Sequence, residues 1–189
     1  MGPADDTSRP LASRSHFPLP KGFRPAAQVD WAHPTEDVPP FLSRNRRYTG
    51  RRAQGVRYER KAQDYLASLV GSADPAGLRP AVYLPSQWWR FSDCGSVRWC
   101  QTDGLFAQPR EGLIIVVEIK YQHTPDAWFQ LRELYEPVVR RAFGPAWTVA
   151  LLEVVKWYDP STFFPERHFL CADPLQPPTG GIGVHIWAP

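Results

Sequence analysis

The chain has 189 residues, of which 43% are hydrophobic, and it includes eight tryptophans and ten phenylalanines. This length and composition suffice for one domain with a substantial core, and they exclude a chain that is disordered throughout. The formal net charge of +3 is too small to indicate a polyanionic partner by itself, so the positions of the charges are more informative than their sum.

Neither the first residues nor the apolar runs favour a secreted or membrane protein. Residues 1–6, Met-Gly-Pro-Ala-Asp-Asp, are not a basic segment followed by an apolar stretch, and no apolar run approaches the roughly 20 residues that span a bilayer. Cys94, Cys100 and Cys171 are an odd number of cysteines for a disulfide framework, which agrees with a reducing compartment. We therefore expect a soluble, cytoplasmic protein without a membrane partner.

The first part of the chain predicts an arm that precedes the domain. Residues 1–43 are rich in proline and keep neither the helical nor the strand period for long. Because proline fixes φ and removes a hydrogen-bond donor, this segment predicts an extended or disordered arm. We place a single domain at 44–189, with its core at about 55–158.

A basic run follows from position 44 to position 61, and Glu59 is its one acidic residue. A solvated charged face and a surface that neutralises DNA phosphates both explain such a run. We favour DNA as the partner, because the positive charge lies just before and within the first predicted helix. The candidate DNA-binding residues are Arg46, Arg47, Arg51, Arg52, Arg57, Arg60 and Lys61.

Hydrophobic periodicity predicts the remaining elements in chain order. Apolar residues at spacings of three and four predict a helix over 56–69, with Gly71 as its stop. Thr124-Pro125-Asp126 is typical of a helix start, and Pro137 should kink or end the helix that follows. Runs of apolar, branched and aromatic residues predict strands over 81–91, 97–106, 113–121 and 147–158, and shorter strands over 168–172 and 183–187. The strand over 113–121 is apolar on both faces until Glu118, as expected of a central strand that is covered on both sides.

The order helix, three strands, helix, strand predicts an α/β fold with a mixed sheet flanked by helices. Three motifs within residues 55–158 stand on these elements: Glu59 in the first helix, Thr102-Asp103-Gly104 on the second strand, and Val117-Glu118-Ile119-Lys120 at the end of the third. With Gln130 in the next helix, they resemble the PD-(D/E)XK nuclease superfamily. The resemblance implies a restriction-endonuclease-like mixed β-sheet core with the order α-β-β-β-α-β, and a Mg²⁺-dependent deoxyribonuclease in which Mn²⁺ can substitute.

The resemblance also assigns roles to these residues. Asp103, Glu118 and the carbonyl of Ile119 would hold the metal, because hard divalent cations prefer oxygen ligands. Lys120 would orient the attacking water or stabilise the charge of the transition state, with Glu59 and Gln130 as further catalytic groups. Without a metal, Asp103 reads as an ordinary Asp-Gly turn residue, and Glu118 and Lys120 read as the solvated end of a strand.

Other interpretations stay open. A catalytically idle nuclease-fold protein that binds DNA or assembles in a phage or mobile element has the same expected fold, and a homo-oligomer is compatible with either function. Cys94, Cys100, His168 and Cys171 could supply four zinc ligands, although buried inert thiols are the default. His123 could contact a phosphate or be a solvated loop residue. Trp88, Trp89 and Trp99 could stack on unpaired bases or belong to the core.

Overall fold

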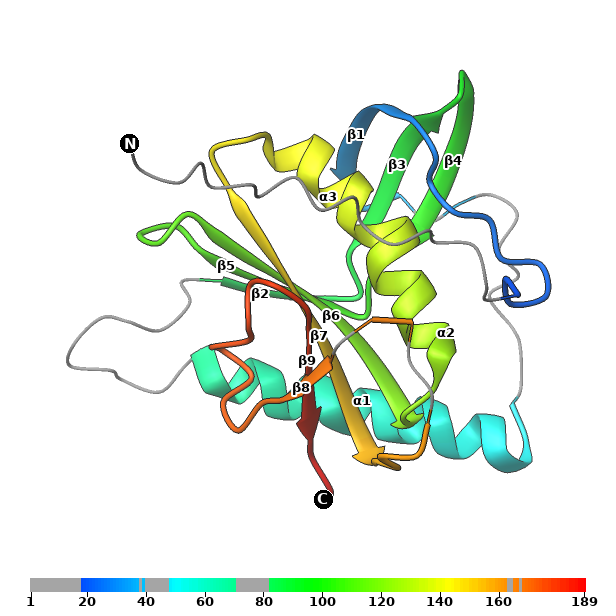
Figure 1. Cartoon of the computed structure of the whole chain (residues 1–189), viewed down its shortest axis with the longest axis vertical. Helices are drawn as coiled ribbons and strands as arrows, with labels where there is room; N and C mark the ends of the chain where they lie inside the picture. Colours follow the sequence, from blue (N-terminus) through cyan, green and yellow to red (C-terminus); the bar gives the residue numbers. More distant parts are fainter. Residues whose placement is uncertain (1–17, 38, 40–47, 71–81, 163–164, 167) are drawn as a thin grey trace, which may run out of the picture.

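The computed structural model describes residues 18–37, 39, 48–70, 82–162, 165, 166 and 168–189. Within these residues the chain is a mixed α/β protein with two helices, a three-stranded antiparallel sheet and a six-stranded mixed sheet (Figure 1). The strands are β1 (Val29–Thr35), β2 (Val82–Pro85), β3 (Trp88–Asp93), β4 (Ser96–Gln101), β5 (Gly104–Gln108), β6 (Leu113–Gln122), β7 (Thr148–Trp157), β8 (His168–Leu170) and β9 (Ile182–Ile186). The helical elements are α1 (Gly50–Val70) and a continuous helix made of α2 (Pro125–Trp128), the π-helical segment η1 (Phe129–Tyr135) and α3 (Glu136–Phe143). None of the described helices combines the length and the apolar character needed to cross a membrane.

The larger sheet has the strand order β2-β5-β6-β7-β9-β8. β5 runs antiparallel to β2 and β6, whereas β6, β7, β9 and β8 are parallel to one another. The side chains from Ile114 to Val117 on β6 are fully buried, so the predicted central strand is confirmed. The short strands predicted near 168–172 and 183–187 are also present; β8 forms an edge, and β9 lies between β7 and β8.

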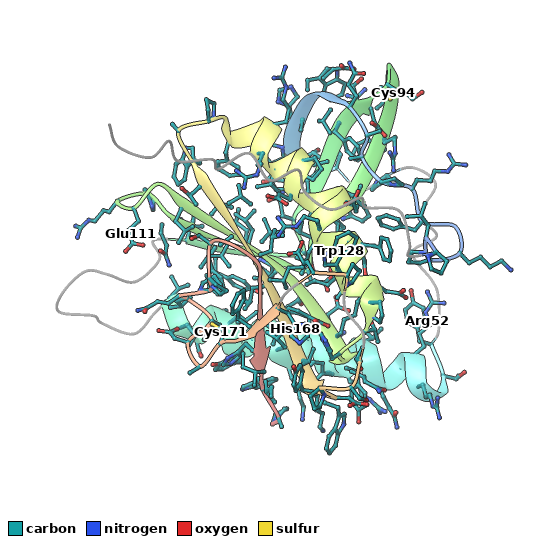
Figure 2. The ribbon with its side chains drawn as sticks, viewed as in Figure 1. Arg52, Cys94, Glu111, Trp128, His168 and Cys171 are labelled. Atoms are coloured by element: carbon teal, nitrogen blue, oxygen red, sulfur yellow. The ribbon has the colours of Figure 1, made fainter. Side chains whose placement is uncertain are left out.

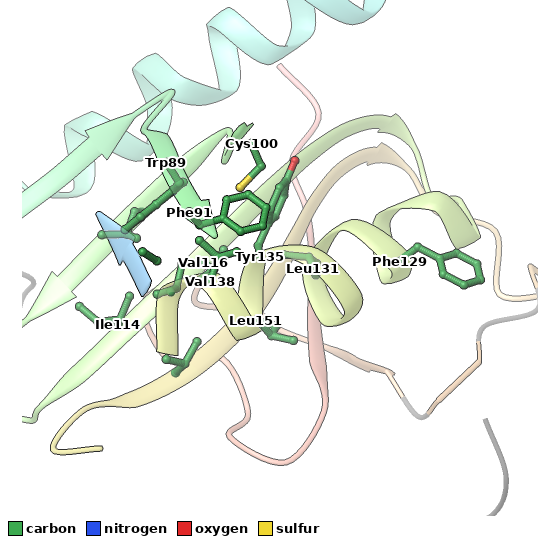
Figure 3. Close-up of a cluster of buried hydrophobic side chains, with 14 of the residues drawn as sticks. Trp89, Phe91, Cys100, Ile114, Val116, Phe129, Leu131, Tyr135, Val138 and Leu151 are labelled. Atoms are coloured by element: carbon green, nitrogen blue, oxygen red, sulfur yellow. The ribbon is translucent and has the colours of Figure 1, made fainter. Parts of the chain in front are cut away.

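The two faces of this sheet have different covers. On one face, α1 buries Tyr58, Ala62 and Leu66 against β5, β6 and β7. On the other face, the α2–η1–α3 helix and the three-stranded sheet enclose a second core that includes Trp89 and Tyr135 (Figures 1 and 3). Alternate residues of β6 therefore belong to different cores, as the period of two in a strand requires.

A bent hairpin connects the two sheets and corrects two strand predictions. The predicted strand over 81–91 is divided into β2 and β3, and the one over 97–106 into β4 and β5. At the bend, the Ser86 N–H donates to the Asp103 carbonyl at 3.0 Å, and the Thr102 N–H donates to the Gln87 carbonyl at 3.0 Å. Ser86 has a φ of 54°, which is uncommon for a residue other than glycine. The hairpin turns here from one sheet into the other, and Asp103 lies at the turning point.

The expected extended or disordered arm does not hold for Val29–Thr35, which pair with β3 as β1. Ala32 on this strand is buried in the core, and the N–H groups of Ala27 and Gln28 donate to Asp93 Oδ1 at 3.0 and 2.9 Å. β1 is an edge strand, where Pro34 is tolerated because one side of the strand needs no hydrogen-bond donor. The rest of the predicted arm, apart from residues 18–28, 36, 37 and 39, lies outside the described residues.

The helix after β6 starts where predicted but continues past Pro137. Thr124 is its N-cap residue in extended conformation, although its side chain makes no capping hydrogen bond. In η1 the backbone follows the wider π-helical turn, and the Glu136 N–H donates to the carbonyl of Leu131, five residues earlier. Pro137 then occupies the first turn of α3, where a missing N–H is tolerated. The π-helical segment contains Gln130 and contacts β6, the strand that carries Glu118.

Candidate active site

The candidate site lies where β5 begins and β6 ends. Gly104 pairs with Val117 in the antiparallel β5–β6 ladder, so the preceding residue, Asp103, lies opposite Glu118. Asp103 Oδ2 accepts a hydrogen bond from the Ile119 N–H at 2.8 Å. This bond holds the Asp103 carboxylate against β6. The Asp103 motif and the Glu118–Lys120 motif are therefore adjacent in the structure.

Glu118 and Lys120 form an ion pair on the same face of β6. Only 1% of the Glu118 side chain is exposed, whereas Lys120 retains 27% exposure and reaches the solvent. Among the described residues, Glu118 Oε2 is buried and has no hydrogen-bond partner. A buried carboxylate oxygen without a partner is unfavourable, so this atom is suited to a cation or to a further donor.

The electrostatics of the three groups are coupled. Burial, and then the charges of Glu118 and Glu59, raise the pKa of Asp103 well above its usual value, despite the hydrogen bond from Ile119 and the charge of Lys120. Burial lowers the pKa of Lys120, but Glu118 and Asp103 outweigh that effect and leave it raised. Clustered carboxylates that repel one another in this way favour the binding of a positive charge.

Two residues of α1 approach the site from the opposite face of the sheet. Glu59 is half-buried, and burial followed by the charge of Glu118 raises its pKa, so it stands close enough to sense the site. Gln63 Nε2 donates to the Asp103 carbonyl and to Ser86 Oγ, both at 2.9 Å. Gln63 thereby holds the bend that positions Asp103. The sequence analysis did not identify it, although its spacing of four from Glu59 places both residues on one side of the helix.

The π-helical segment covers the site from the other side. Gln130 Nε2 donates to Tyr135 Oη at 3.2 Å. Tyr135 is only 4% exposed, and burial followed by the charges of Glu118 and Asp103 raises its pKa well above the usual value. Tyr135 is therefore close enough to Glu118 and Asp103 to sense their charges, and Gln130 is joined to it by the hydrogen bond. The catalytic role predicted for Gln130 stays a prediction.

Glu153 on β7 is a further carboxylate that the sequence analysis missed. It is the register partner of Glu118 in the parallel β6–β7 ladder, and its side chain is fully buried. Its Oε2 contacts His123 Nδ1 at 2.6 Å, and His123 is itself only 1% exposed, so His123 is not the solvated loop residue that was considered. Burial raises the pKa of Glu153 although His123 opposes the shift. Glu153 stands in an apolar strand sequence, where the only signal was one charged residue in the run Leu151-Leu-Glu-Val-Val155.

The donor set can be compared with the needs of a divalent cation. The described residues contain no group of three or more His, Cys, Asp or Glu side chains arranged to hold a metal ion. Asp103 and Glu118 supply only two carboxylates, so a cation here would need a backbone carbonyl and waters to complete its shell, as Mg²⁺ often has in proteins. The Ile119 N–H points towards Asp103, and a residue in an antiparallel ladder presents its N–H and C=O to the same neighbour, so we expect the Ile119 carbonyl on that side too.

The alternative zinc site is wrong for the described residues. Cys94 is exposed at the β3–β4 turn, whereas Cys171 and His168 lie towards the other end of the molecule (Figure 2). Cys100 is buried in the core beneath β4.

The tryptophans singled out in the sequence have different environments. Trp89 is 1% exposed and donates its indole N–H to Thr102 Oγ1 at 3.3 Å, so it belongs to the core. Trp88 and Trp99 are half-buried, and the guanidinium of Arg90 lies 5.8 Å from the centre of the Trp99 ring. They lie on the three-stranded sheet, outside the Asp103–Glu118 cluster.

The basic residues of α1 are exposed, and Figure 2 labels one of them, Arg52, near the start of the helix. The described members of this set are Arg51, Arg52, Arg57, Arg60 and Lys61. The Arg52 guanidinium lies 4.5 Å from the centre of the Tyr48 ring. Arg46 and Arg47 lie outside the described residues.

Comparisons of the chain with protein-family models, curated proteins and solved structures find no match.

Proposed function

We propose that this chain is a Mg²⁺-dependent deoxyribonuclease with a restriction-endonuclease-like core. The observation that carries the proposal is the hydrogen bond from the Ile119 N–H to Asp103, which joins the carboxylate just before β5 to the strand that carries Glu118 and Lys120. The arrangement of the core supports it: α1 packs on one face of an antiparallel β5–β6 pair, and a helix leads from β6 to the parallel strand β7. Within the larger sheet, the order α1, β2, β5, β6, helix and β7 supports the α-β-β-β-α-β core that the motifs imply, with the β3–β4 hairpin between β2 and β5.

The residues would divide the work of phosphodiester hydrolysis. Asp103, Glu118 and the Ile119 carbonyl would hold the ion, which when bound polarises a phosphoryl oxygen and lowers the pKa of water. Lys120 is partly exposed and positively charged, so it would place an ammonium against the phosphate as negative charge develops. The packing that buries Glu118, Leu131 and Tyr135 would exclude bulk water from one side of the reaction.

The runner-up is a catalytically idle protein of the same fold that binds DNA or assembles with partners. The ion pair between Glu118 and Lys120 favours this alternative, because it engages both groups with each other. The unpartnered Glu118 Oε2 favours the enzyme, since a binding module has no use for a buried carboxylate oxygen that lacks a donor.

The test is cleavage of linear, nicked, branched and single-stranded DNA by purified protein with Mg²⁺ or Mn²⁺. Asp103→Ala, Glu118→Ala and Lys120→Ala should each lower the rate by about 10²-fold or more, because each removes a group that acts on developing charge. Glu111→Ala is the matched control, since Glu111 is an exposed carboxylate at the β5–β6 turn (Figure 2).

Two results would count against the proposal. Metal-dependent cleavage that survives all three substitutions would place the chemistry elsewhere. An absence of cleavage on every substrate by a folded, metal-loaded protein would favour the idle alternative.

A further inference from the structure

Trp157, the last residue of β7, is 58% exposed. Single exposed hydrophobic residues are ordinary on protein surfaces, so exposure alone carries no argument. The position of this side chain in the sheet is the informative feature.

Trp157 lies on the face of the sheet that carries the candidate site. In the parallel β6–β7 ladder, Glu118 pairs with Glu153, Lys120 with Val155, and Gln122 with Trp157. Because side chains alternate along a strand, Trp157 is on the same side as Glu153, and therefore as Glu118 and Lys120. It lies two residues beyond the register of Lys120, which is about 6–7 Å along the strand. An indole at this distance flanks the phosphate that Lys120 would contact.

One lysine, Lys156, lies beside this indole. The Lys156 ammonium is 6.0 Å from the centre of the Trp157 ring and 5.6 Å from that of Tyr121. Tyr121 and Lys156 belong to the opposite face of the sheet, where Tyr121 packs edge-on against Tyr58 of α1 with ring centres 5.9 Å apart. The nearby carboxylate of Asp159 accepts hydrogen bonds from the backbone and the hydroxyl of Ser161.

We infer that Trp157 is a stacking platform for an unpaired DNA base next to the phosphate that is cleaved. Charge complementarity selects a nucleic acid as the occupant, because an exposed aromatic ring beside Lys156, on the same face of the sheet as Lys120, suits a base with its phosphates. A base within a duplex is already stacked on its neighbours, so the platform favours single-stranded DNA or a frayed end. This inference rests on the proposed nuclease function and names its substrate class.

The experiment measures the binding of full-length protein to a single-stranded oligothymidine of about 20 nucleotides, longer than the ~4–16-nucleotide sites of single-strand binders. A blunt duplex of equal length is the comparison, and Ca²⁺ replaces Mg²⁺ to limit cleavage. Trp157→Ala should weaken single-strand binding by about 5- to 150-fold, the range for losing one stacked base, with a much smaller change for the duplex. Trp157→Phe should keep most of the affinity, because a phenyl ring still stacks.

Trp99→Ala is the matched control, since Trp99 also has a cationic neighbour, Arg90, but lies on the other sheet. Quenching of tryptophan fluorescence by the oligonucleotide should be larger in the wild type than in Trp157→Phe, which reports stacking directly.

Each outcome decides the inference. Unchanged single-strand affinity in Trp157→Ala overturns it, and so does equal weakening for single strand and duplex or an absence of single-strand binding by the wild type. Failure of the nuclease proposal would give a different result. Trp157→Ala would still weaken single-strand binding selectively, but the wild type would show no metal-dependent cleavage.

Discussion

The carboxylates of the candidate site should make the metal-free protein less stable than its Asp103→Asn variant. The folded-state pKa of Asp103 is raised, so the folded protein holds this proton more tightly than the unfolded chain does. The resulting stability is fully present below the unfolded pKa of about 3.9 and is lost as the pH rises through the raised value. Asparagine does not ionise, so the variant does not lose stability as the pH rises. Its side-chain oxygen can still accept the hydrogen bond from Ile119.

A divalent cation should reverse the order of stability. An ion that binds only the folded state at a concentration 100 times its Kd stabilises it by about 2.7 kcal/mol. For a chain of this size, each kcal/mol raises Tm by about 2–4 °C, so saturating Mg²⁺ or Mn²⁺ should raise the wild-type Tm by about 5–10 °C. Asp103→Asn removes one of the two side-chain ligands and should lose most of that increase.

The assay is thermal unfolding after exhaustive chelation, at several pH values, with and without added Mg²⁺, Mn²⁺ or Ca²⁺. Calcium should also raise Tm while supporting little cleavage, because its looser coordination geometry activates water less effectively. Glu111→Gln should behave as the wild type does. An equal increase with metal in Asp103→Asn would refute the assignment of this ligand, and a lower metal-free Tm in that variant at neutral pH would refute the electrostatic argument.

Two further predictions concern the basic run and the buried pair beside the site. Replacing Arg46, Arg47, Arg51 and Arg52 by alanine should weaken DNA binding about equally across sequences; each lost phosphate contact should flatten the slope of log K against log salt by roughly 0.9 in duplex titrations, and an unchanged slope would leave the run as a solvated surface. His123→Ala should lower the free energy of unfolding by about 1–3 kcal/mol in denaturant titrations, because it removes the side-chain hydrogen-bond partner of the buried Glu153 carboxyl, and an unchanged free energy of unfolding would refute a contribution of this contact to stability.

The bent hairpin shows where sequence patterns stop being informative about the fold. Both predicted strands exist, because aromatic and branched residues favour extended structure whichever sheet they join. Their division depends on cross-strand hydrogen bonds of Ser86 and Thr102, which no local pattern announces. β1 was missed for a related reason: a proline-containing segment forms a strand only because β3 offers it an edge.

The site shows the same division between local and long-range information. The motif residues Asp103, Glu118 and Lys120 were identifiable from local sequence. Asp103 precedes a glycine at a predicted turn, and Glu118 and Lys120 are charged residues at the end of an apolar run. Gln63 and Glu153 were not, since their importance arises from contacts with residues 40 positions away in one case and from the β6–β7 register in the other. Register depends on the packing of whole strands and cannot be read from one strand alone.

The sequence by itself determined the mixed α/β composition, the buried central strand and the residues that end it, because hydrophobic periodicity and charged residues at strand ends are local properties. Only the tertiary structure decided that the first two predicted strands divide between two sheets, and that Glu153 and Trp157 share a face with Lys120. Those features follow from strand order and register, which are set by the burial of both faces of the six-stranded sheet and by hydrogen bonds between segments far apart in the chain.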